Sequence, residues 1–150
     1  ADGHENGIEA AFFFFFHDVV DLVVQGQLDA HFHDAIDFAV QHPKPIQARR
    51  WVEAGLTIGL GTDLCPGGYA VSMPLALQFA CRWNGLSPEE ALVASTTGSA
   101  RACGLSDRGV IAPGKLADLQ VWDVGSLEEM VYRIGHNPVR TVIKNGKVVV

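Results

Sequence analysis

The chain has 150 residues, of which 48% are hydrophobic, and can therefore bury the core of one ordinary domain. It is too short for a complete (β/α)8 barrel, which typically needs about 250 residues. The formal net charge of −6 leaves no excess of positive charge to attract nucleic acid or an anionic membrane, so we expect neither as a partner. The longest apolar run, residues 10–16, is far shorter than the roughly 20 residues that span a bilayer, and no Lys or Arg precedes it as in a signal peptide.

The three cysteines indicate a reduced protein. Cys65, Cys81 and Cys103 form no Cys-x-x-Cys pair, and an odd number of cysteines makes a poor disulfide framework. We interpret them as free thiols and expect a cytoplasmic protein. Cys81 and Cys103 each fall in an apolar helical pattern, so we expect both to fill the core.

The composition changes near residue 45. Residues 1–45 hold eight acidic residues and one basic residue, whereas residues 46–150 hold nine acidic and ten basic residues. The first segment also contains five consecutive phenylalanines and five of the six histidines. A run of phenylalanine has neither helical nor strand periodicity, so it fits a strand buried on both faces or sequence foreign to the fold equally well. The chain begins without Met, which fits a fragment or a processed chain.

From residue 45 onward the pattern becomes regular. In chain order we predict a helix over 46–54 ended by Gly55, a short apolar strand over 56–60, a turn-rich loop over 63–69 and an apolar helix over 72–83. The next helix carries the clearest start signal, because Ser87 is followed by Pro88 at the first helical position and by Glu90 three residues on, as in a capping box. We expect this helix to reach about Cys103, with Gly104 ending it.

Short strands and turns are predicted after that helix. They are a strand over 109–112, a turn at Pro113-Gly114, a strand over 117–122, and a hairpin whose strands, 139–144 and 147–150, flank Asn145-Gly146. This order indicates the last β/α unit of a barrel joined to a β appendage. We therefore predict an N-terminal segment of undetermined fold over 1–45, the last β/α unit and helices of a barrel over 46–106, and β-sandwich strands over 107–150.

Asp63 is the candidate catalytic residue. It ends the predicted apolar strand, and barrels carry their chemistry on the loops that follow the strands. A carboxylate there can coordinate a divalent cation and accept a proton from metal-bound water. Alternatively, Asp63 caps the following turn or helix, which is a common role for Asp after a strand.

Several segments resemble a known family. Residues 59–67 (GLGTDLCPG), with Ser72-Met73-Pro74 and then LSPEEA at 86–91, are similar to the stretch around the eighth barrel strand of imidazolonepropionases. Residues 114–119 (GKLADL) resemble the element by which the wider amidohydrolase superfamily enters its small β-sandwich, and 135–148 (GHNPVRTVIKNGKV) match its closing strands. The D-x-x-P-G loop, Val131-Tyr132 and the G-x-N-x-V pattern narrow the resemblance to imidazolonepropionase. It covers about residues 46–150, roughly the last quarter of such an enzyme.

The resemblance implies a fold, an activity and a site. The fold is α/β: the C-terminal portion of a (β/α)8 metal-dependent hydrolase barrel, followed by part of a small β-sandwich domain. The activity is hydrolysis of the cyclic amide of 4-imidazolone-5-propanoate to N-formimidoyl-L-glutamate, in histidine degradation, with one zinc or iron ion. Asp63 is implied to be a metal ligand and proton shuttle. The implied partner is a small-molecule substrate, and we expect the complete enzyme to be a homo-oligomer.

The predicted substrate contacts depart from the family pattern. Cys65 stands where the family usually has Asn, and Gly68 stands where Ser or Thr is usual. A thiol is a weak donor and cannot replace the paired donor and acceptor of an amide, so Cys65 indicates an altered substrate preference or a variant subgroup. Gly67 matches the family and is expected to offer its backbone N–H to the substrate.

The histidines do not complete the metal site. His31-Phe32-His33 mimics the His-x-His pair that such enzymes carry on their first strand, and on a strand the two would share one face. The surrounding apolar residues fall at helical spacing, however, and on a helix the two imidazoles diverge by roughly 200°. We therefore favour an exposed helix, and we expect His17 and His136 to be surface or hydrogen-bonded residues rather than ligands.

Three functions stay open at this point. The first is a partial metal-dependent cyclic amidohydrolase, and the second is another amidohydrolase-superfamily hydrolase or deaminase. The third, of a different class, is a non-catalytic remnant that binds a partner. Because Asp63 alone cannot hold a catalytic metal, we expect these 150 residues by themselves to be inactive.

Overall fold

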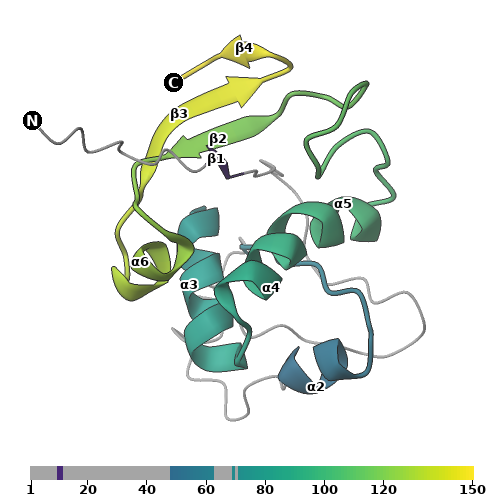
Figure 1. Ribbon diagram of the computed structural model, residues 1–150, viewed down its shortest axis with the longest axis vertical. Coiled ribbons are helices and arrows are strands. Elements are labelled where there is room, and N and C mark those ends of the chain that lie inside the picture. The colour runs from purple at the N-terminus through teal and green to yellow at the C-terminus, as the bar shows by residue number, and fades with distance from the viewer. Residues whose placement is uncertain (1–9, 12–47, 63–68, 70) are drawn as a thin grey trace, which may run out of the picture.

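The computed structural model describes residues 10–11, 48–62, 69 and 71–150. Its elements, in chain order, are β1 (Ala10–Ala11), α2 (Ala48–Glu53), α3 (Met73–Asn84), α4 (Pro88–Val93), the π-helix η1 (Ala94–Gly98), α5 (Ser99–Ala102), β2 (Leu119–Trp122), α6 (Leu127–Tyr132), β3 (Val139–Lys144) and β4 (Lys147–Val148). Figure 1 shows the four strands gathered at one end of the molecule, with the helices beneath them. No helix in these described ranges has the length and apolar character needed to cross a membrane.

Side-chain and glycine caps define the ends of the helices, and one of them, the capping box at Ser87, was predicted. Ser72 caps α3 by accepting a hydrogen bond from the Leu75 amide, and α3 ends at Gly85 in the left-handed conformation, with φ 71°. At the start of α4 both halves of the capping box are present: the Glu90 amide donates to Ser87 Oγ, and the Ser87 amide donates to Glu90 Oε2 at 2.8 Å. The predicted helices over 72–83 and from Ser87 to Cys103 are confirmed, although the second contains a π-helical turn.

Two predicted strands are wrong. Residues 56–60 form no strand, because no other strand of the described chain lies beside them and the backbone of Leu60 bonds instead to helix η1. Residues 109–112 also form no strand, since Gly109 has φ 88° and its carbonyl accepts from the Thr97 hydroxyl rather than from a neighbouring strand. Conversely, α6 was not predicted, although Ser126 caps it by accepting from the Glu129 amide.

The sheet is antiparallel throughout, in the order β1-β2-β3-β4. The β3–β4 hairpin confirms the Asn-Gly prediction: Asn145 and Gly146 have φ of 50° and 76°, both left-handed, as a type I′ turn requires. Its second strand is shorter than the predicted 147–150. A register shift between Val121 and Trp122 interrupts the pairing of β2 with β3.

The core joins the sheet to the helices. Trp122 from β2, Leu77 from α3 and Met130 from α6 are at most 1% exposed and belong to one apolar cluster. A fully buried amide reinforces this joint: Gln78 donates to the Met130 carbonyl at 3.0 Å and accepts from the Gly135 amide at 2.8 Å. Because a buried amide without partners is costly, these bonds hold α3 and α6 in one relative position.

A buried carboxylate locks the β appendage. Asp118 lies 2.5 Å from Lys144 Nζ and 3.3 Å from Arg108 Nη1, and it accepts from the Asn145 amide at 2.8 Å. Burial by itself raises the pKa of Asp118, but the hydrogen bonds from Lys144 and Asn145 and the two positive charges together lower it below 3.8. The carboxylate therefore stays charged and ties β2 to the hairpin.

Replacing Asp118 with Asn should lower the free energy of unfolding at pH 7 by about 1–3 kcal/mol, because it removes the charged acceptor of three donors. A carboxyl group whose pKa is lower in the folded than in the unfolded chain stabilises the fold at pH values above its ordinary pKa. The difference in free energy of unfolding between the parent chain and Asp118→Asn should therefore shrink as the pH falls below 3.8. Urea unfolding between pH 7 and pH 3 measures both effects. Asp107→Asn is the control, since Asp107 also pairs with Arg108 but its side chain is 51% exposed. Equal losses in the two variants would contradict a special role for Asp118.

Candidate functional site

The predicted site residues Asp63, Cys65, Gly67 and Gly68 lie outside the described residues, as do His17, His31 and His33. The structure describes the chain on either side of this loop, as far as Thr62 and again from Val71 onward. These two flanking segments determine where the loop begins and ends.

The incoming segment is buried and bonded to a helix. Ile58 and Leu60 are 5% and 4% exposed. The Leu60 amide donates to the Ala94 carbonyl at 3.1 Å and to Ser99 Oγ at 3.0 Å, while the Leu60 carbonyl lies 2.7 Å from the same hydroxyl. Both backbone polar groups of Leu60 are thus satisfied by the helix, three residues before Asp63.

The π-helical turn makes this docking possible. In η1 the Ala94 carbonyl receives the amide of Ser99, five residues on, in place of the usual four. The helix also comes very close to the incoming segment, because a Cβ added at Gly98 would lie 1.9 Å from the Ile58 carbonyl oxygen. Gly98 has an ordinary helical φ of −62°, so glycine is required here for space rather than for backbone conformation.

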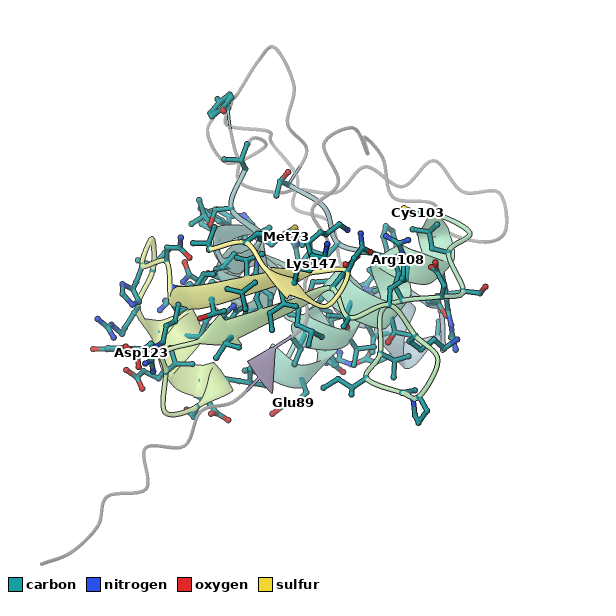
Figure 2. The ribbon with its side chains drawn as sticks, turned by 90° about the horizontal axis from the view of Figure 1, so that it is seen from above. Met73, Glu89, Cys103, Arg108, Asp123 and Lys147 are labelled. Carbon is teal, nitrogen blue, oxygen red and sulfur yellow. The ribbon has the colours of Figure 1, made fainter. Side chains whose placement is uncertain are left out.

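The outgoing segment begins α3. Ser72 adopts an extended conformation and caps the helix, and Pro74 in the first turn is buried. Met73, the first residue of α3, is labelled in Figure 2. The capping that fixes the start of α3 therefore also fixes where the loop ends.

The described residues do not supply a complete metal site. Within the described ranges, no three side chains of His, Cys, Asp or Glu come together as metal ligands. His136 is half-buried, and its backbone amide donates to the Arg133 carbonyl at 3.0 Å. A metal ion at Asp63 would need further ligands besides the residues that the described part brings together.

The two described cysteines are free thiols without catalytic character. Burial raises the pKa of Cys81 to about 11, and it packs against the core cluster as predicted. A thiol with so high a pKa is almost wholly protonated at neutral pH and is a poor nucleophile. Cys103 is half-buried at the end of α5, outside that cluster, so its predicted place in the core is only partly met.

The sequence analysis did not single out Gly98 and Ser99, which contact the segment that leads to Asp63. A signal was present, since residues 95–99 (STTGS) place five residues of modest or poor helix propensity in the middle of a helix. Such a run indicates that something other than helix stability selects those residues. The partner, however, is 39 residues away and has no local signature.

Comparisons with known proteins identify the class. The model of the amidohydrolase family matches residues 35–149, so the chain belongs to the amidohydrolase family. Imidazolonepropionase from Pyrobaculum arsenaticum is 42% identical over 60% of this chain and 23% of its own length. The enzyme of the same name from Ruegeria pomeroyi is 47% identical over 59% of this chain and 22% of its own length. The chain thus spans about a quarter of the length of these curated relatives.

Solved structures agree on the fold. Atrazine chlorohydrolase from Arthrobacter aurescens, in a variant complexed with zinc and atraton, superposes with a TM-score of 0.64 at 26% identity, over 77% of this chain and 30% of that one. N-isopropylammelide isopropylaminohydrolase from Burkholderia multivorans gives a TM-score of 0.58 at 26% identity, over 71% and 29%. The predicted fold class, the C-terminal portion of a (β/α)8 metal-dependent hydrolase barrel with part of a β-sandwich, is confirmed.

Gly98→Ala should lower the free energy of unfolding by about 1–3 kcal/mol, because the new methyl group meets the backbone carbonyl of Ile58, which cannot move without shifting the whole segment. A loss of stability would be informative, because replacing Gly with Ala inside an unobstructed helix normally raises the free energy of unfolding. Gly125→Ala is the control, because its added Cβ meets only the flexible Glu129 side chain. Urea unfolding of both variants is the measurement, and a Gly98→Ala chain as stable as the parent would contradict the close approach.

Proposed function

We propose that the protein carrying this segment is a metal-dependent cyclic amidohydrolase that opens 4-imidazolone-5-propanoate to N-formimidoyl-L-glutamate, a step of histidine degradation. The observation that carries the proposal is the 42–47% identity to enzymes named imidazolonepropionase. The structural neighbours named for triazine and ammelide chemistry reach only 26%. The identity therefore favours an imidazolone ring over those rings.

Asp63 would act at the centre of this reaction. It follows a segment whose backbone is fixed at Leu60, so its carboxylate would be presented from a rigid base rather than from a free loop. A bound zinc or iron ion would supply an activated water molecule for the attack on the ring carbonyl. Asp63 would be one ligand of that ion and would accept the proton of the attacking water.

The substrate would meet the residues that follow Asp63. Gly67 and Gly68 would let the backbone approach the ring closely, with N–H groups free to donate to its polar atoms. Cys65 would lie where the family usually places Asn. This substitution supports a second candidate function, hydrolysis of a related ring by the same metal-dependent chemistry, since a thiol offers weaker hydrogen bonding than an amide.

Asp63→Asn in the full-length protein should lower kcat by at least about 10²-fold, because it removes a charged ligand and the proton acceptor together. Asp123→Asn is the matched control, since Asp123 is an exposed carboxylate beyond β2. Turnover is followed by the loss of substrate absorbance, and metal content is measured in both proteins. Near-normal turnover by the Asp63→Asn protein with its metal present would refute the assignment.

Cys65→Asn should raise kcat/KM for 4-imidazolone-5-propanoate, because the amide both donates and accepts hydrogen bonds. The unfolding midpoint of the variant is measured alongside, so that a gain in folding is not mistaken for a gain in substrate binding. An unchanged kcat/KM at unchanged stability would show that Cys65 does not contact this substrate, whereas a fall would favour the second candidate function.

A further inference from the structure

We infer that Ser99 is a positioning residue for Asp63: its hydroxyl fixes the backbone from which the proposed catalytic carboxylate extends. This inference rests on the proposed function, because it assigns Ser99 a role only if Asp63 takes part in the reaction. It also concerns a residue in the middle of a helix, distant in sequence from the loop that it serves.

The hydroxyl of Ser99 contacts both polar groups of one peptide segment. It accepts from the Leu60 amide at 3.0 Å and lies 2.7 Å from the Leu60 carbonyl oxygen, which together with the Ala94 carbonyl at 2.8 Å competes for its proton. The Leu60 amide also donates to the Ala94 carbonyl at 3.1 Å, and Ser99 adds a contact at the Leu60 carbonyl to that bond. Contacts to both the N–H and the C=O define the orientation of Leu60 as well as its place.

Two other hydroxyls of the same helix bond within the helix. Ser95 Oγ donates to the Leu92 carbonyl at 2.9 Å, and Thr96 Oγ1 donates to the same carbonyl at 2.7 Å. These are ordinary bonds of helical Ser and Thr to the preceding turn of their own helix. Thr97 bonds to the Gly109 carbonyl on the way to the sheet, whereas Ser99 bonds to Leu60, 39 residues away, in the segment that leads to Asp63.

Leu60 is close enough to Asp63 in the sequence for a shift of its backbone to move Asp63 as well. Leu60 and Asp63 are three positions apart in the sequence, so their Cα atoms are at most about 11 Å apart. A displacement of Leu60 by a fraction of an ångström therefore moves the base of Asp63 directly. Misplacement of a reacting group by about 1 Å can cost roughly 10²-fold in rate.

Ser99→Ala and Ser95→Ala in the full-length protein form a matched pair. Ser95→Ala loses one bond within the helix and should cost about 1 kcal/mol of the free energy of unfolding, whereas Ser99→Ala loses its contacts to Leu60 and should cost about 1–2 kcal/mol. Only Ser99→Ala removes contacts of Leu60, whose amide keeps its bond to the Ala94 carbonyl. We expect it to lower kcat at least 10-fold relative to Ser95→Ala, to release metal at a lower chelator concentration, and to speed amide hydrogen exchange in residues 56–62 without a similar change elsewhere.

The outcomes separate the inference from the proposed function. Equal kcat, equal metal retention and equal exchange in the two variants, with Asp63→Asn inactive, would overturn the positioning role of Ser99 and leave the proposed function standing. Absence of turnover by the parent full-length protein would overturn the proposed function. Normal turnover by Asp63→Asn would overturn the proposed role of Asp63, and with it the reason for positioning that residue. Faster exchange in residues 56–62 with an unchanged kcat would also overturn the inference, since Leu60 would then be loosened without consequence for the reaction.

Discussion

The described structure depends on the docking of an extended segment against a helix that has been locally rewound. The π turn over Ala94–Gly98 places the Ala94 carbonyl where it receives both the Ser99 amide and the Leu60 amide. A regular α-helix would direct that carbonyl to the residue four positions on. One contact, the packing of residues 58–60 on this helix, therefore depends on the π turn, on the small size of Gly98 and on the hydroxyl of Ser99. That contact determines where the chain enters the proposed catalytic loop.

The same helix also carries the connection to the sheet. Thr97 Oγ1 donates to the Gly109 carbonyl at 2.8 Å, and a Cβ added at Gly109 would lie 2.8 Å from the Ala100 Cβ. Beyond Gly109 the chain reaches Asp118, which pins β2 to the hairpin through Lys144. The helix from Pro88 to Ala102 is thus held by contacts with two separate segments, and a change in its packing would act on both the loop entrance and the β appendage.

The sequence predicted those parts of the fold that depend on interactions between residues close together in the chain. The capping box at Ser87 and the Asn145-Gly146 turn are each decided by residues within a few positions of one another, and both appear as expected. Residues 56–60 were predicted as a strand because their apolar pattern is equally satisfied by a strand and by an extended segment packed on a helix. The choice between the two depends on a partner 39 residues away, which no window of sequence contains. The site residues Asp63, Cys65, Gly67 and Gly68 were proposed from resemblance and stay predictions.

Two of the segments that carry the family resemblance are the GKLADL element at 114–119 and the loop after residue 62, and the structure describes the contacts of the first. In the GKLADL element, Lys115 donates to the Ser106 carbonyl, Ala117 receives the Gly146 amide, and Asp118 holds the hairpin. Each of these three contacts stabilises the β appendage, and none of them involves the loop after residue 62. We therefore propose that substrate choice is encoded in that loop, where Cys65 and Gly68 depart from the pattern of the family that the sequence resembles. On this proposal, the chain keeps the fold signature of its family while its substrate contacts diverge.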